Sequence, residues 1–133
     1  MRRLPVTVAA LALLASSAFG LVGCGGGGGG SSSGGRKNAP VPAGARVIDV
    51  QAQSFEFTPA KIDVTAGEPI AIKLSSSDTF HDFTIQGKGY ITGADQGKSG
   101  EGGFKISKPG NYTFYCSVPG HRQAGMVGTI TVS

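Results

Sequence analysis

From Arg46 to the C-terminus the chain consists of short runs in which apolar and polar residues alternate, and this period of two is the feature that most limits its fold. Glycine, proline or aspartate interrupts the runs at intervals of roughly eight to twelve residues, and no stretch has helical periodicity. The pattern predicts one all-β sandwich or barrel of antiparallel strands. Only the glycine-rich stretch 87–103 lacks a clear period, and we expect a long loop there with one short strand. The predicted inward-facing residues are Ile48, Val50, Ala52, Ile62, Val64, Ile70, Ile72, Leu74, Phe83, Ile85, Ile130 and Val132.

The N-terminal 23 residues indicate export. Arg2 and Arg3 precede an acid-free apolar run that ends in small residues, which is typical of a secretion signal. A membrane helix is the alternative, but Pro5, two serines and the small-residue ending disfavour it. The ending "LVGC" resembles the lipobox of bacterial lipoproteins, and this resemblance implies cleavage after residue 23 and lipidation of Cys24.

The segment 24–44 is predicted to be a flexible tether. Its glycines and serines bury no apolar area to offset their backbone entropy, and two prolines stiffen it only locally. The folded domain is therefore expected at residues 45–133, enough for one small core. The net charge of +4 comes from Arg2, Arg3, Arg36 and Lys37, because the domain has equal numbers of basic and acidic residues. A basic nucleic-acid-binding surface is accordingly not predicted.

At the ends of two predicted strands, a side chain of a type that can bind a metal is predicted to face inward. In "NYTFYC", Cys116 has the parity of Phe114, and in "HDFTI", His81 has the parity of Phe83. With Cys24 lipidated, Cys116 would be a lone thiol in an oxidising compartment, where it needs protection. Each residue alone has an ordinary interpretation as a core or strand-edge residue.

The loop "SVPGHRQAG" after Cys116 is short, so Cys116, His121 and Met126 are predicted to lie at one end of the sandwich, with His81 able to join them. The four residues are the domain's only histidines, cysteine and methionine. Two imidazoles, a thiolate and a thioether suit copper in both oxidation states. Zinc accepts a His, His, Cys set, but thioether is a poor zinc ligand and structural zinc sites use more cysteines.

At these residues the chain resembles the cupredoxins, the blue (type 1) copper proteins of the plastocyanin and azurin family. "YCSVPGHRQAGMVGTITV" is similar to the C-terminal ligand loop of that family, with the spacing of auracyanin and rusticyanin, and "FTPAKIDVTAGEPIAIKLSSSDTFHDFTI" to its N-terminal half. The resemblance implies a Greek-key sandwich and one copper ion bound by His81, Cys116, His121 and Met126.

The resemblance also implies roles around the metal. The outer edge of His121 should emerge through an apolar patch of Val118, Pro119 and Ala124, where redox partners dock. Many members of the family have an asparagine directly after the first histidine ligand. Its side chain braces the residue that follows the cysteine ligand. Here that position is Asp82. Its carboxylate is expected to accept a hydrogen bond from the hydroxyl of Ser117 and to lower the reduction potential of the copper.

The predicted function is that of a membrane-anchored carrier of single electrons between extracytoplasmic redox proteins. The protein is expected either in a periplasm or on the outer face of the cell membrane. The alternative is a lipoprotein for copper delivery or buffering. An enzyme is disfavoured because the two histidines leave none for a second copper, and an immunoglobulin-like module leaves the Cys and His loop without a purpose. A monomer without organic substrate or nucleic-acid partner is expected.

Overall fold

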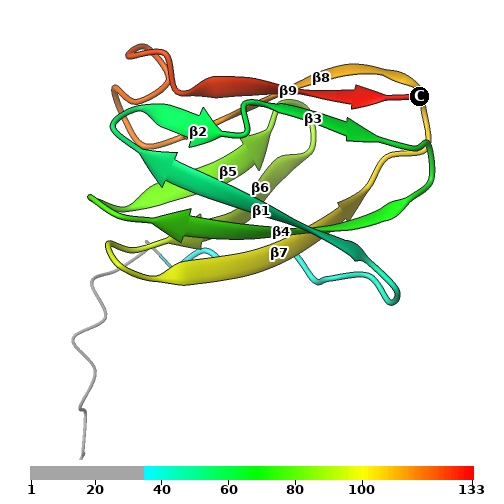
Figure 1. Cartoon of the computed structure of the whole chain (residues 1–133), viewed down its shortest axis with the longest axis horizontal. Coiled ribbons are helices and arrows are strands. Elements are labelled where there is room, and N and C mark those ends of the chain that lie inside the picture. Colours follow the sequence, from blue (N-terminus) through cyan, green and yellow to red (C-terminus); the bar gives the residue numbers. More distant parts are fainter. Residues whose placement is uncertain (1–34) are drawn as a thin grey trace, which may run out of the picture.

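A computed structural model describes residues 35–133 of the chain. Within them, two β-sheets pack face to face, and residues 35–45, before the first strand, run along one side (Figure 1). The predicted all-β sandwich is confirmed. The strands are β1 (Arg46–Gln53), β2 (Glu56–Thr58), β3 (Lys61–Val64), β4 (Pro69–Ser76), β5 (His81–Ile85), β6 (Gly89–Ala94), β7 (Ser99–Lys105), β8 (Gly110–Tyr115) and β9 (Val127–Val132).

The sheets are mixed rather than purely antiparallel. One sheet has the order β2-β1-β4-β7 and the other β3-β9-β8-β5-β6. Strands β1 and β4 pair in parallel, as do β3 and β9, whereas the other neighbours are antiparallel. The prediction of an antiparallel sandwich was wrong for these two pairs. Alternation fixes which side chains face the core but not the direction of the neighbouring strand.

The core lies between the sheets, where the alternation predicted it. Ile70, Ile72 and Leu74 are fully buried, and Phe83 stacks on Phe114 with ring centroids 4.3 Å apart. Phe57 packs edge-on against Phe114 at 5.1 Å. Burial of these and the other core side chains stabilises the folded state, because removing apolar area from water is the dominant favourable contribution to folding.

The stretch expected to be a long loop instead forms most of β6 and β7. Its glycines hide the alternation because they carry no side chain. They are needed for close packing: a Cβ at Gly100 or Gly102 would overlap the backbone of β6. Glycine in a strand interior commonly marks such a close approach of another backbone.

Residues 39–42, which lie within the segment 24–44 predicted to be a flexible tether, pack against the domain. Ala39 donates its N–H to Ile91 O (2.8 Å) and accepts from the N–H of Gly103 (3.1 Å). A Cβ on Gly103 would lie 2.8 Å from the Cα of Val41, so the glycine makes room for this segment. The predicted signal and Cys24 lie outside the described residues.

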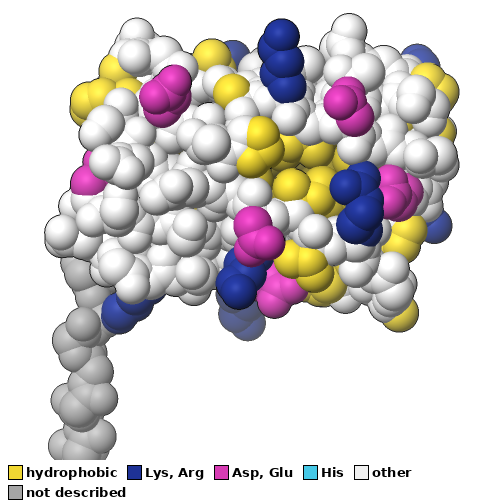
Figure 2. All heavy atoms as spheres, in the orientation of Figure 1, with side chains coloured by type: hydrophobic (Ala, Val, Ile, Leu, Met, Phe, Trp, Pro, Cys, Tyr) yellow, Lys and Arg dark blue, Asp and Glu magenta, His cyan; other side chains and the backbone are white. Residues whose placement is uncertain are grey.

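Charges of both signs are interspersed over the face of the molecule in Figure 2. Arg46 and Glu68 form an ion pair, with Nε and Oε1 2.6 Å apart.

None of the residues 35–133 belongs to a helix that is long and apolar enough to cross a bilayer.

Candidate metal centre

Three connections meet at one end of the sandwich. They are the β1–β2 turn, the β4–β5 connection and the β8–β9 loop, seen together at the left of Figure 1. Side-chain contacts tie them to one another: Phe55 of the first turn packs on His121 of the loop, and Ser54 N donates to Asp78 Oδ2 of the connection (2.7 Å). The loop ends are closed by a hydrogen bond from Cys116 N to Met126 O (3.2 Å).

Cys116 follows the last residue of β8 and is completely buried. Its Sγ accepts the backbone N–H of Asp82, at 3.4 Å, from the start of β5. Burial raises the pKa of the Cys116 thiol, although the N–H groups of Asp82 and Val118 oppose the shift. A metal bound to this sulfur has to displace its proton, so metal binding and proton release are coupled here.

His81 is the first residue of β5 and is also completely buried. Its Nε2 lies 2.8 Å from Asp78 Oδ1, and its Nδ1 lies 3.9 Å from Cys116 Sγ. Burial raises the pKa of Asp78, but hydrogen bonds from Ser54 N, His81 and Thr79 N outweigh this and lower it to about 2. The ionised carboxylate only accepts, so the ring nitrogen of His81 that faces it, Nε2, carries a proton, and Nδ1 is the nitrogen that faces the thiol.

His121 lies in the β8–β9 loop and is partly buried. Its Nδ1 is 3.5 Å from Cys116 Sγ, and its ring centroid is 5.0 Å from that of His81. Burial, and then the neighbouring His81, lower the pKa of His121 below its ordinary value. The imidazole is therefore neutral at neutral pH, the form that binds a metal.

Sequence reasoning missed Phe55. It forms the β1–β2 turn with Ser54, and both residues have positive φ, 66° and 48°, as a two-residue type I′ turn requires. The Phe55 ring meets His121 edge-on at 5.0 Å, and 46% of its surface is exposed. A bulky residue in this backbone region is unusual and costs free energy. The two-residue gap between alternating runs was a signal for the turn, but not for its contact with His121.

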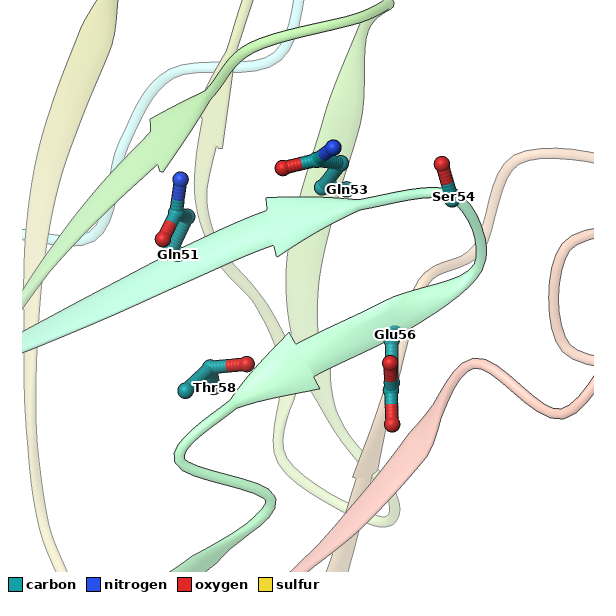
Figure 3. A pocket seen from close by; sticks show the side chains of 5 residues that line it. All are labelled: Gln51, Gln53, Ser54, Glu56 and Thr58. Atoms are coloured by element: carbon teal, nitrogen blue, oxygen red, sulfur yellow. The ribbon is translucent and has the colours of Figure 1, made fainter.

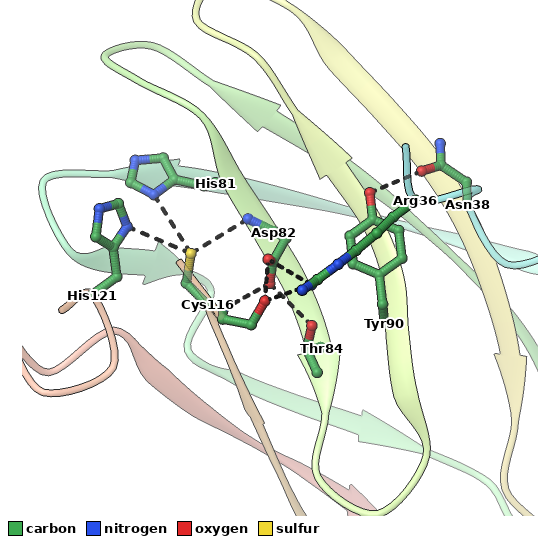
Figure 4. A network of polar contacts seen from close by, with 9 residues as sticks. Arg36, Asn38, His81, Asp82, Thr84, Tyr90, Cys116 and His121 are labelled. Atoms are coloured by element: carbon green, nitrogen blue, oxygen red, sulfur yellow. Dashed lines mark hydrogen bonds and ion pairs between the residues drawn. The ribbon is translucent and has the colours of Figure 1, made fainter. Parts of the chain in front are cut away.

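Met126 completes the cluster. It is fully buried, and its N–H donates to His121 O (3.1 Å). The ligand atoms of His81, Cys116 and His121 all lie within 4.8 Å of one another. The structure thus brings together the four residues singled out in the sequence, three of them with donor atoms converging on one point (Figure 4).

Comparison with known proteins agrees with this geometry. Residues 45–133 match the model of the copper binding proteins of the plastocyanin/azurin family. The chain belongs to this family. It is a cupredoxin whose cofactor is copper, and the set of two imidazoles, a thiol and a thioether suits that metal.

Individual relatives of this cupredoxin include the copper-resistant cuproprotein CopI of Rubrivivax gelatinosus, 27% identical over 119 residues, covering 74% of this chain and 72% of CopI. Plastocyanin of the fern Dryopteris crassirhizoma is 36% identical over 94 residues, covering 59% of this chain and 89% of the plastocyanin. A solved structure of auracyanin B superimposes with a TM-score of 0.64 at 20% identity, covering 72% of this chain and 94% of auracyanin B.

The cupredoxin site continues beyond its donor atoms. The contact expected between Asp82 and Ser117 is present: Oδ1 accepts Ser117 N at 2.8 Å, and Oδ2 accepts Ser117 Oγ at 2.5 Å. Thr84 Oγ1 donates to the same carboxylate at 3.0 Å. Asp82 and Thr84, which alternation directed away from the core, are both buried, because partners such as Ser117 cover that face of β5.

The predicted docking residues lie in the same loop. Val118 is partly buried against the core, while Pro119 and Ala124 are exposed near His121.

A separate polar hollow lies beside the β1–β2 hairpin, on its outer face (Figure 3). It is distinct from the metal cluster, and its lining is Gln51, Gln53, Ser54, Glu56 and Thr58.

Proposed function

We propose that this cupredoxin carries single electrons and that His81, Cys116, His121 and Met126 bind its copper ion. One observation carries the proposal: three donor atoms lie within 4.8 Å of one another at a closed end of the sandwich. Copper, when bound, supplies a Cu(II)/Cu(I) couple. A preformed ligand set favours rapid electron exchange because little has to move between the two states.

The surrounding residues hold this set in place. Asp78 fixes the tautomer and ring orientation of His81, and the N–H of Asp82 is directed at the sulfur of Cys116. The carboxylate of Asp82 fastens Ser117, the next residue along the chain. Hydrogen bonds of this kind orient ligands and tune the electronic properties of the metal.

His121 is the proposed route for the electron, because it is the partly exposed ligand, whereas His81 is buried. Val118, Pro119 and Ala124 would form the docking patch for redox proteins, with Phe55 extending it. A small apolar contact suits brief association and rapid release. The role proposed for the chain is transfer between proteins, without an organic substrate or catalysis of its own.

The N-terminal region supports an extracytoplasmic, membrane-anchored location. In this proposal residues 1–23 are a signal peptide, Cys24 carries the lipid, residues 24–44 link it to the domain, and 45–133 form the copper domain. A linker that confines the domain near the membrane raises its concentration at membrane-bound partners. A monomer is sufficient for this function.

Copper delivery or buffering is a second candidate, favoured by the likeness to a protein named as a copper-resistant cuproprotein. Delivery needs a site that releases its metal readily. Closed packing around Cys116 and His81, both completely buried, supports the carrier instead.

The deciding experiment is a visible absorption spectrum of the full chain with one equivalent of Cu(II), followed by reduction and reoxidation. An electron carrier gives an intense thiolate-to-copper band that disappears and returns, and Cys116→Ser abolishes it. Slow loss of copper to a chelator supports the carrier, whereas rapid loss supports delivery. A pale spectrum would contradict the proposed site.

A further inference from the structure

We propose that Arg36, nine residues before the predicted domain boundary, is a positioning residue of the copper centre. It holds Ser117 and compensates the charge of Asp82, and it thereby raises the reduction potential. The inference rests on the proposed copper site and extends it to a segment that sequence analysis assigned to the tether. It also makes docking of this segment depend on the oxidation state of the metal.

The contacts form a chain from solvent to the ligand loop. Arg36 Nη1 donates to Ser117 Oγ at 2.8 Å, and Ser117 Oγ donates in turn to Asp82 Oδ2 at 2.5 Å. Arg36 Nη1 lies 3.7 Å from the same carboxylate oxygen. Figure 4 shows the two histidines on one side of the Cys116 sulfur and Asp82 with Arg36 on the other.

The burial of the two charged groups differs sharply. The side chain of Asp82 is 2% exposed and that of Arg36 is 56% exposed. In residues 35–133, Arg36 is the one basic side chain found within ion-pair distance of this carboxylate. Hydrogen bonds from Ser117 and Thr84 stabilise this carboxylate, and Arg36 adds the positive charge that compensates it, because an uncompensated charge in the interior is costly.

Other contacts keep Arg36 in position. Its guanidinium lies 5.5 Å from the ring centroid of Tyr90 on β6, within the range of cation–π attraction. The Tyr90 hydroxyl donates to Asn38 Oδ1 at 3.2 Å, and Ala39 pairs with Ile91 and Gly103. The segment 36–39 is therefore held by contacts to both β6 and β7, and Arg36 is placed by more than its own ion pair.

The electrostatic consequence follows from the sign of the charges. A carboxylate beside the metal favours the more positive Cu(II) state, and a nearby guanidinium opposes this effect. Loss of Arg36 should therefore favour oxidation. Because coupling between two sites is reciprocal, reduction of the metal should also strengthen docking of the segment.

The test measures the redox equilibrium of the full copper-loaded chain against a small one-electron mediator of known potential. Arg36→Gln is expected to shift the equilibrium toward the oxidised protein by about fivefold, the low end of typical coupling between sites. Lys37→Gln removes the same charge one residue away and should shift the redox equilibrium much less. Equal shifts in the two variants would overturn the inference, since they would reflect only the change in the net charge of the protein.

A double-mutant cycle identifies the partner. In an Asp82→Asn background, Arg36→Gln should lose most of its effect, because the charge that Arg36 compensates is gone. An undiminished effect would contradict the assigned role. Failure of the copper site itself is distinguishable, because it would remove the thiolate-to-copper band from the unmodified protein, whereas failure of this inference would leave that band intact.

A second readout needs no copper. In the metal-free full chain, docking shields the peptide bond after Arg36 from trypsin. Asp82→Asn should accelerate cleavage at that bond severalfold, while Asp49→Asn, a matched change at an exposed residue of β1, should not. Equal cleavage rates in the unmodified chain and both variants would show that Asp82 does not hold the segment.

Discussion

Asp82 accepts two hydrogen bonds from Ser117, one from the backbone N–H at 2.8 Å and one from the hydroxyl at 2.5 Å. Each residue directly follows a proposed ligand, His81 in one case and Cys116 in the other. The carboxylate therefore fastens the start of β5 to the start of the ligand loop. In the proposed site, the same group would place a negative charge beside the bound copper ion.

Asp82→Asn should raise the reduction potential. The amide oxygen can still accept the N–H of Ser117, so the brace is largely kept while the charge that favours Cu(II) is lost. The expected rise is on the order of tens of millivolts, moderated by the charge of Arg36. Protein-film voltammetry measures it, with Asp49→Asn as the control, and an unchanged potential would show that the charge is fully screened.

Asp78→Ala should weaken metal binding by about 10-fold to 100-fold, the usual effect of losing a partner of a ligating histidine. Without the carboxylate, Nε2 of His81 loses its acceptor and the ring is free to change tautomer or rotate. Competition with a chelator for Cu(II) or Zn(II) measures the affinity. Asp78→Asn keeps an acceptor and should be much less affected; equal losses in both variants would argue against tautomer control.

Part of the fold follows directly from the sequence. Residues of one parity, such as Ile72 and Leu74, face the core as alternation requires. Glycines at 100, 102 and 103 carry no such signal, and β7 was therefore missed. Parallel pairing of β1 with β4 was also missed, because it depends on the path of the chain between the two sheets.

The metal cluster was predictable because its residue types are scarce in the domain and its loop is short. Cys116, His121 and Met126 had to lie close together once the loop returned to the same end of the sandwich. The residues around them were not predictable in this way. Phe55 and Arg36 reach the site from segments distant in sequence, and only tertiary packing brings them there.

Phe55→Ala should raise the pKa of His121 in the metal-free protein toward its ordinary value. Burial is the largest cause of the lowered pKa, and removing the ring admits water to the imidazole. Loss of the ring contact should also cost about 0.5–1.5 kcal/mol of stability. An NMR titration of the histidine ring protons measures the shift. Val47→Ala, at an exposed residue of β1, is the control, and a pKa unchanged by Phe55→Ala would contradict the shielding role.

The Arg46–Glu68 pair should make the domain sensitive to acid. The hydrogen bond from Arg46, and then that from Thr65 N, lower the pKa of Glu68 to about 2, from an ordinary value of 4.5 for the free side chain. A lowered folded-state pKa means that the contribution to stability is complete above about pH 4.5 and is lost as the pH falls toward 2. Glu68→Gln should therefore be less stable than the unmodified protein above that range, and the two should converge as the pH falls.

Urea unfolding of the metal-free chain at a series of pH values tests this pattern. Arg46→Gln removes the other partner and should likewise weaken the dependence on pH between 4.5 and 2. Glu101→Gln changes an exposed carboxylate on β7 and should follow the unmodified protein. If Glu68→Gln kept the full acid dependence, other carboxylates would be responsible for it, and the ion pair would be one of the many exposed pairs that contribute little.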